Sequence, residues 1–279
     1  MTRSPANAKL IVIEAGRPRP GLLREAWEYR ELLALLAWRD ILVRYKQTVI
    51  GVAWSVIRPL LLMVVFTVVF GKLARMPSDD VPYPILVFAA LLPWQLFATA
   101  FTEASNSLIN NASMLSKVYF PRLILPVSAV IVSLMDFLIA SAIFGFLMAW
   151  YQFVPPWRIV FLPFFLILTL MGALGLGMWM GALNVKYRDF RYIVPFIVQV
   201  GLYASPVGFS TNVIPEEWKL IYSLNPMVGV IDGFRWAVLG RDSQLYVHGF
   251  VVSAAMVFAI FCFGIVYFRK TERSFADVI

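Results

Sequence analysis

Six apolar stretches, each long enough to cross a lipid bilayer, constrain this chain more than any other feature. They cover residues 51–70, 84–108, 122–151, 157–183, 190–210 and 249–268. An α-helix rises about 1.5 Å per residue, so roughly 20 apolar residues span the hydrocarbon core. The sequence therefore predicts an all-α membrane protein with six transmembrane helices.

The composition agrees with burial in lipid rather than in a soluble core. The 279 residues are 61% apolar and 14% charged, whereas about a quarter of an average soluble domain is charged. The basic residues behind the net charge of +8 stand beside the apolar stretches, which favours a role in topology over nucleic-acid binding. One cysteine, Cys262, and one histidine, His248, exclude a disulfide framework and a multi-histidine metal site.

Lys and Arg are unevenly distributed over the segments that join the apolar stretches. Residues 1–50, the second and fourth connections with the span ends beside them, and the residues after 268 together hold 17 of them. The first, third and fifth connections, counted in the same way, together hold 6, among them Lys219, Arg235 and Arg241 after the fifth stretch. Because short connections rich in Lys and Arg remain on the cytoplasmic side, both termini are expected in the cytoplasm.

The remaining chain divides into an arm, a helix and a tail. Residues 1–21 contain Gly16, Pro18 and Pro20, and they are expected to form an irregular cytoplasmic arm. Residues 22–48 are expected to form an amphipathic helix, since 22–46 lack helix breakers. This helix fits either the inner headgroup layer or the surface of a partner protein, and the sequence leaves both open. The six-span domain then covers 49–270, and a cytoplasmic tail covers 271–279.

Two connections have helical patterns of their own. After Ser210, Pro215 favours a helix start, Pro226 ends that helix, and the apolar stretch 227–239 is too short to span. We expect an outer pair of helices whose second member is re-entrant or interfacial. In the inner connection 110–121, Met114, Leu115, Val118 and Tyr119 recur at helical spacing, which predicts a short surface helix.

Three ionisable residues lie within the predicted spans. Each would cost a few kcal/mol if it faced lipid at mid-depth. Arg58 fits either snorkelling toward the inner headgroups or guidance of an anionic lipid headgroup. Glu103 is expected at the interface, and Asp136 is expected against another helix or in a water-filled cavity. No chain of carboxylates suits a proton relay, which argues against a proton-coupled carrier.

Small and aromatic residues distinguish the fourth and fifth spans. Gly177 and Gly181 form a Gly-x-x-x-Gly pair, which favours close helix packing. In the fifth span, Phe196, Gln199 and Tyr203 share one helical face before a kink expected near Pro206. That face suits lipid contact, core packing or a pore wall for sugar rings.

Sequence motifs for nucleotide binding and hydrolysis are missing. The chain has no Gly-x-x-x-x-Gly-Lys-Ser/Thr loop, so it is not expected to bind ATP in the usual way. It also has no Gly-x-Ser-x-Gly or His-Glu-x-x-His motif. We therefore expect a transport subunit without catalytic residues or a metal site.

Several blocks, in order along the chain, resemble ABC-2-type permeases that export cell-surface polysaccharides. They are residues 39–54 with 58–60, then 111–122, 184–189, 203–206 and 224–227. The resemblance covers about residues 25 to 270, and the blocks together are far more specific than any one of them.

The resemblance implies an assembly in the bacterial inner (plasma) membrane. Its members are a homodimer of six-helix subunits and two copies of a cytoplasmic ABC ATPase, which binds ATP and magnesium. The cargo would be an undecaprenyl-linked glycan such as O-antigen, capsule or teichoic acid. This chain itself would need no cofactor, and its contacts would be with membrane lipids and not with nucleic acid.

The resemblance also implies two sets of functional residues. The connection 110–122 would touch the ATPase and gate the pore. Its candidate residues are Asn111, Met114, Leu115, Lys117, Tyr119, Pro121 and Arg122. The candidates for the substrate path are Arg44, Lys46, Trp54, Arg58, Phe196, Gln199 and Tyr203.

Other functions stay open on sequence alone. One is an ABC-2 exporter of drugs or lipids, and another is a membrane glycosyltransferase or acyltransferase. A secondary carrier is a third, although the chain lacks an obvious inverted repeat.

Overall fold

The computed structural model describes residues 27–46, 49–78, 81–115, 117–118, 120–240, 245–272 and 275, with the backbone alone at 49–52. The predicted arm 1–21 and the start of the predicted amphipathic helix lie outside these residues. Within them all regular structure is helical and no strand occurs. The predicted all-α class is therefore confirmed for this part of the chain.

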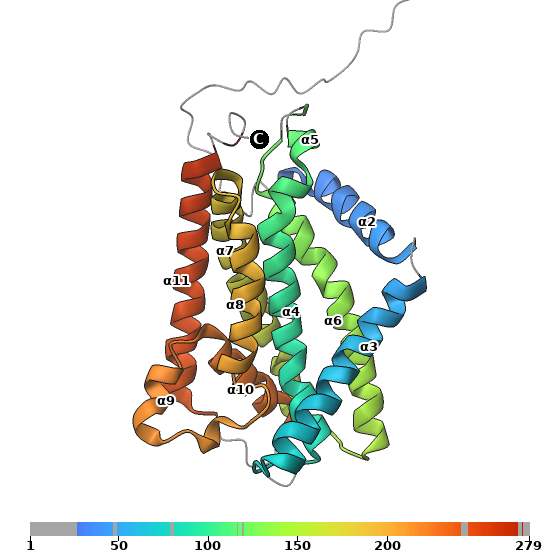
Figure 1. Ribbon diagram of the computed structural model, residues 1–279, viewed down its shortest axis with the longest axis vertical. Coiled ribbons are helices and arrows are strands. Elements are labelled where there is room, and N and C mark those ends of the chain that lie inside the picture. The colour runs from blue at the N-terminus through green and yellow to red at the C-terminus, as the bar shows by residue number, and fades with distance from the viewer. Residues whose placement is uncertain are drawn as a thin grey trace, which may run out of the picture.

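Five helical segments are long and apolar enough to cross a membrane, by length and composition. They are α3 (Val49–Phe66) continued by the π-helix η1 (Thr67–Leu73), α4 (Tyr83–Asn110), α6 (Ile124–Trp150), the 3-10 turn η2 (Trp157–Phe161) with α7 (Leu162–Lys186), and α11 (Val247–Thr271). They run beside one another along the long axis of the molecule (Figure 1). Helices α2 (Arg30–Lys46) and α5 (Ala112–Leu115) lie at one end, here called the α2 end. Helix α9 (Glu216–Tyr222) lies at the opposite end, here called the α9 end.

The fifth predicted span is shorter than the sequence suggested. Helix α8 covers Phe190–Ala204, only 15 residues, and the backbone turns extended at Ser205, just before Pro206. Proline lacks the N–H that the next helical hydrogen bond would need, so the helix ends there. The described structure thus carries five helices of spanning length and one short apolar helix.

Helix α10 (Pro226–Leu239) is the second member of the predicted outer pair. The Asn225 side chain caps it by accepting a hydrogen bond from the Met227 N–H, Pro226 stands at its first position, and Gly240 ends it in the left-handed conformation (φ 62°). Its 14 residues are mostly buried, and it packs against α4, α7 and α11. Helix α10 is therefore a half-helix buried within the bundle.

Arg235 connects α10 to the irregular segment that follows α8. The sequence analysis counted it among the charges of the fifth connection, and its side chain is only 4% exposed. Its guanidinium donates to the backbone carbonyls of Phe209 (2.7 Å), Val207 (3.0 Å) and Leu86 (3.3 Å). The Tyr83 hydroxyl donates to the carbonyl of Gly208 (2.5 Å). These side chains supply the donors that the interrupted helix no longer provides.

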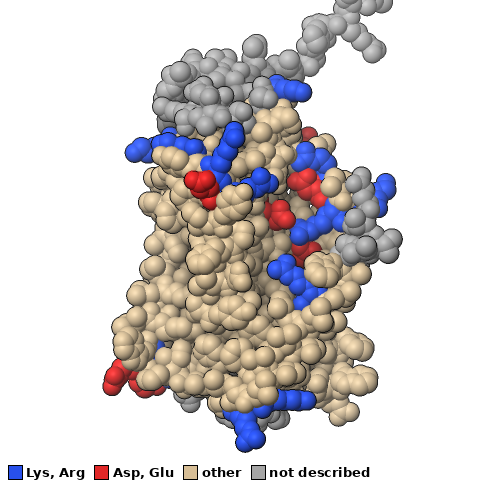
Figure 2. Space-filling model, viewed as in Figure 1, with Lys and Arg blue, Asp and Glu red and all other residues tan. Residues whose placement is uncertain are grey.

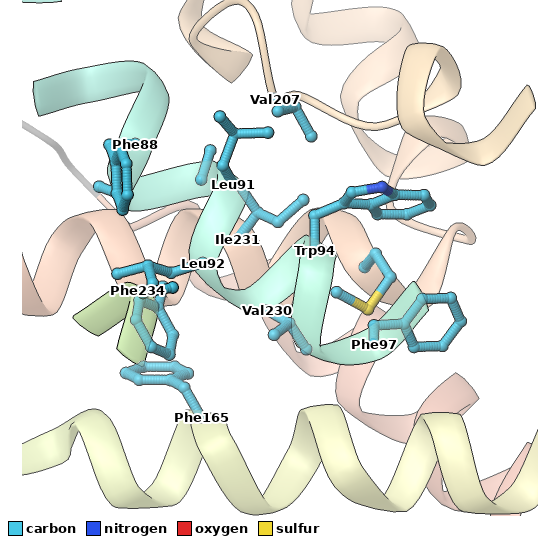
Figure 3. Close-up of a cluster of buried hydrophobic side chains, with 14 of the residues drawn as sticks. Phe88, Leu91, Leu92, Trp94, Phe97, Phe165, Val207, Val230, Ile231 and Phe234 are labelled. Atoms are coloured by element: carbon cyan, nitrogen blue, oxygen red, sulfur yellow. The ribbon is translucent and has the colours of Figure 1, made fainter. Parts of the chain in front are cut away.

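Helix α4 forms the centre of the bundle. In its most apolar 18-residue stretch, 83% of the residues are buried, against 17% in the first span and 28% or less in the other three. Figure 3 shows side chains of α4, among them Phe88, Leu91 and Trp94, in one buried cluster with residues of α10 and with Phe165 of α7. The core of the protein is therefore built around one helix that hardly meets lipid.

Glycines allow the central helices to approach one another. A Cβ at Gly177 would lie 2.5 Å from the Cβ of Ala104 on α4, which confirms the predicted packing role of this glycine. A Cβ at Gly264 on α11 would lie 2.1 Å from the backbone oxygen of Gly175 on α7. Close backbone contact is the main source of helix association in lipid, where burial of apolar surface contributes little.

Gly264→Ala is expected to lower the free energy of unfolding by about 1–3 kcal/mol, because a backbone must shift to admit the methyl group. Gly145→Ala on α6 is the matched control, since a Cβ there meets nothing within 4 Å. The control should be neutral or slightly stabilising. Thermal unfolding in detergent measures both, and equal stability of the two variants would contradict this packing account.

Candidate functional site

A cavity of about 590 Å³ lies between α3, α4 and α8. This volume falls within the range of roughly 300–1,000 Å³ usual for ligand sites. Its polar or aromatic lining comes from four helices: Arg44, Trp54, Arg58, Trp94, Gln95, Thr99, Thr102, Glu103 and Gln199. Four of the predicted substrate-path residues, Arg44, Trp54, Arg58 and Gln199, thus meet at one place.

The polar wall of this α3–α4–α8 cavity is a stripe on the otherwise apolar α4. Gln95, Thr99 and Thr102 recur at helical spacing and point the same way. The Thr99 and Thr102 hydroxyls donate to the carbonyls of Gln95 and Ala98, both at 2.8 Å. Their lone pairs are therefore turned outward, where they can accept hydrogen bonds from a ligand.

Gln95 carries an unpartnered donor. Its Nε2 is buried and has no hydrogen-bond partner among the described residues. The residue also lines a smaller adjoining pocket of about 80 Å³, together with Arg58 and Asp136. A buried amide without a partner costs about 1–3 kcal/mol, so a ligand that accepts from it gains binding energy. The sequence analysis missed Gln95, although its spacing to Thr99 and Thr102 was visible.

A cluster of charged groups closes the cavity toward the α2 end. Arg44 pairs with Asp136 on α6 (3.2 Å) and with Glu103 on α4 (3.6 Å). Asp136 also accepts hydrogen bonds from the Tyr45 hydroxyl (2.5 Å) and from the Ser55 hydroxyl (3.2 Å). These five residues are called the Arg44 cluster below. Asp136 lies against other helices, one of the two surroundings expected for it.

The Tyr45 phenol acts as a fixed donor in this cluster. Burial and, to a smaller extent, the hydrogen bond to Asp136 together raise the pKa of Tyr45 to about 12. The phenol therefore keeps its proton at physiological pH and donates to the carboxylate. Together with the ion pair from Arg44, it holds the end of α2 against α6.

Arg44 and Arg58 differ in their electrostatic surroundings. Arg44 is compensated by two carboxylates, whereas no ion pair to Arg58 is found among the described residues. Figure 2 shows basic and acidic side chains gathered beside α2, whereas the surface between the two ends of the bundle is largely uncharged. An anion that enters the cavity would therefore interact mainly with Arg58.

The remaining substrate-path candidates do not line the cavity. Lys46 is exposed at the end of α2. Phe196 and Tyr203 are 65% and 64% exposed on α8, and the Tyr203 ring stacks on Phe66 at 6.3 Å. Of the predicted aromatic–polar face of α8, the structure directs only Gln199 into the cavity.

The predicted coupling connection forms the short helix α5 and a turn into α6. Asn111 accepts a hydrogen bond from Arg39 (2.9 Å), which ties the connection to α2. Met114, Leu115 and Pro121 are partly buried, while Lys117 and Val118 are exposed. Arg122 donates to the backbone carbonyl of Glu272, just after α11. Tyr119 lies outside the described residues.

No group of three or more His, Cys, Asp or Glu residues that could hold a metal ion occurs in the described part of the chain. The carboxylates of the Arg44 cluster are engaged with a guanidinium and hydroxyl donors instead.

Comparison with known proteins identifies relatives of similar length. The family described as ABC-2 type transporter matches residues 31–239. The O-antigen export system permease protein RfbA of Myxococcus xanthus is 30% identical over 77% of this chain and 82% of its own length. The protein of the same name from Klebsiella pneumoniae is 27% identical over 89% of this chain and 95% of its own length. The polysialic acid transport protein KpsM of Escherichia coli is 20% identical over 78% and 85%.

Asp136→Ala is expected to loosen α2, because Arg44, Tyr45 and Ser55 lose their shared acceptor. The stability loss should be about 1–3 kcal/mol, and hydrogen exchange in residues 40–46 should become faster. Glu216→Ala is the control, since the Glu216–Lys219 pair (2.5 Å) stands at an exposed helix start and should contribute less than about 1 kcal/mol. Unchanged exchange in α2 after Asp136→Ala would contradict the tether.

Proposed function

The chain belongs to the ABC-2 type transporter family, and on that premise we propose that it is the membrane-spanning permease of an ATP-driven polysaccharide exporter. The cargo is a cell-surface glycan linked to a polyprenyl pyrophosphate. The observation that carries the proposal is the α3–α4–α8 cavity, whose lining combines amides, hydroxyls, charges and indole rings. Relatives over most of the chain are named for export of O-antigen and transport of polysialic acid.

The chemistry of the cavity suits a glycan better than a drug or a lipid tail. Sugars present hydroxyl edges to groups such as Gln95 and Gln199, and apolar ring faces to indoles such as Trp54 and Trp94. A purely apolar cargo would leave the amide of Gln95 without an acceptor. An ABC-2 exporter of drugs or lipids is therefore the second candidate.

The proposed assembly is a homodimer with two copies of a cytoplasmic ABC ATPase, which bind ATP and magnesium. The cavity opens on a side where Trp54, Phe196 and Tyr203 are more than half exposed. A second protomer facing this side would enclose a common path. Exposed side chains of this size on α3 and α8 support contact with another protomer or with lipid, and the cavity between them favours the former.

The proposed orientation places the α2 end at the cytoplasmic face of the inner membrane. Both termini are then cytoplasmic, and α2 lies in the inner headgroup layer, where its exposed Leu35 and Trp38 contact lipid. In this arrangement α8 enters from the cytoplasmic side, and the buried α10 occupies the outer half of the bundle. The irregular segment between them is tolerated because Arg235 and Tyr83 satisfy its carbonyls.

In the proposed mechanism, ATP binding brings the two ATPase subunits together. Contact at residues 110–122 passes this motion to α4 and α6, and the cavity widens. The pyrophosphate of the cargo interacts with Arg58, while Arg44 stays neutralised by its carboxylates and Lys46 marks the entrance. The sugars follow along Gln95 and Gln199.

Arg58→Ala is expected to lower glycan export about 10- to 100-fold, the loss that follows removal of one charged hydrogen bond of about 1.5–3 kcal/mol. Dimer assembly and binding of the ATPase should stay intact. Lys72→Ala, at the far end of the same helix, is the control and should export normally. The measurement is the amount of surface glycan, together with lipid-linked glycan retained at the inner leaflet, in cells with this exporter alone. Normal export by the Arg58 variant would remove Arg58 from the path.

Gln95→Leu is expected to have opposite effects on folding and on transport. The substitution removes a buried donor without a partner, so thermal stability in detergent should stay equal or rise by about 1 kcal/mol. Glycan export should fall, because the ligand loses its donor. A variant that is less stable but exports normally would show that Gln95 is a packing residue only.

A further inference from the structure

The turn that leads from α5 into α6 is held by the segment that follows α11. The backbone N–H of Arg122 donates to a carboxylate oxygen of Glu272 (3.3 Å), and the Arg122 guanidinium donates to the Glu272 backbone carbonyl. The same guanidinium lies 5.8 Å from the centre of the Phe275 ring. Arg122 is thus joined at three points to Glu272, which lies 150 positions later, and to Phe275.

These contacts are buried although they lie beyond the spans. Phe275 is 1% exposed, Glu272 is 6% exposed and Phe120 is 5% exposed. The Phe275 ring meets Phe268 edge to face, with ring centres 5.4 Å apart. All the aromatic members belong to one buried cluster, called the α2-end cluster: Leu36, Leu108, Phe120, Leu123, Ile124, Leu125, Met178, Ala182, Phe268 and Phe275.

The connection therefore has an exposed tip and a fixed base. Val118 is 58% exposed, and Lys117 beside it is exposed, whereas Phe120 and Leu123 are buried in the α2-end cluster. Lys117 and Val118 are thus open to a partner, whereas Phe120 and Leu123 are not. A displacement of the tip moves α6 as a unit only if the base is rigid, and the base is rigid because Glu272 and Phe275 close over it.

The α2-end cluster also contains Leu36 of α2. About two turns further along the same helix, Arg44 and Tyr45 hold Asp136 and Glu103 beside the α3–α4–α8 cavity. The base of the connection and the cavity are thus joined by one continuous helix, which is held at Leu36 and again at Arg44 and Tyr45.

We propose that the segment after α11 is a clasp in which Glu272 and Phe275 position the connection 117–123, so that movement of the ATPase reaches the cavity. The inference rests on the proposed function, because it takes this connection as the site of ATPase contact. Glu272 and Phe275 are positioning residues, which act through Arg122 and Phe120. Without these contacts the complex still assembles, but the connection deforms and no longer passes the motion of the ATPase to α6.

The test uses the full permease–ATPase complex in lipid nanodiscs and in cells. Phe275→Ala and Glu272→Ala should assemble with the ATPase normally, while the glycan exported per ATP hydrolysed falls about fivefold or more. Hydrogen exchange in residues 117–123 should become faster, with α4 and α7 unchanged. Phe258→Ala, an exposed aromatic of α11, is the matched control and should behave as the wild type.

Conservative variants separate positioning from simple packing. Glu272→Gln keeps an acceptor for the Arg122 N–H and should restore most of the coupling, and Phe275→Leu should restore part of it. If Phe275→Ala does not accumulate, Phe275→Leu with Glu272→Ala carries the same test. The positioning role would be overturned if all these variants assembled poorly while the complexes that did form exported as much glycan per ATP as the wild type.

The two proposals fail in different ways. Wild-type coupling and wild-type exchange in Phe275→Ala would remove the clasp and leave the exporter untouched. A wild-type chain that binds no ATPase and moves no glycan would refute the proposed function. In that case, hydrogen exchange of the isolated permease still tests the clasp, because the clasp must slow the exchange of residues 117–123.

Discussion

Every backbone carbonyl and N–H at membrane depth must find its partner within the protein, and this requirement shapes the whole chain. Continuous helices satisfy it wherever they run unbroken. Where α8 stops at Ala204, the guanidinium of Arg235 and the hydroxyl of Tyr83 supply donors for the freed carbonyls. The half-helix α10 is therefore inseparable from the interruption, because it brings Arg235 to the place where donors are missing.

The same rule applies to charge. Asp136 on α6 is stable in its position because α2 delivers Arg44 and Tyr45, and α3 delivers Ser55. This pairing holds a peripheral helix against the bundle and at the same time places polar groups beside the cavity. Structural stability and the proposed site thus depend on the same contacts, so a substitution that alters one also alters the other.

Local features of this fold were predictable from the sequence, and long-range pairings were not. Apolar length located the five helices of spanning length, and Pro226 with the apolar stretch 227–239 located α10. Arg235 was counted only for topology, because charge and position alone do not reveal its burial among distant carbonyls. The partner of Asp136 stands 91 positions away at Tyr45, a distance that no periodicity spans. Gln95 was the exception, since its stripe with Thr99 was present in the sequence and was overlooked.

The contact between Gly175 and Gly264 holds α7 and α11 together at backbone distance. With a backbone oxygen seated against a bare Cα, α7 and α11 cannot slide past each other, and α4 is enclosed beside them. The first span, by contrast, buries little of its surface in the protomer. In the proposed mechanism, the cavity widens when α4 and α6, which receive the motion of the connection, move relative to α3 and α8. In such an exporter, the thickness of the glycan that fits is set by how far these helices move apart.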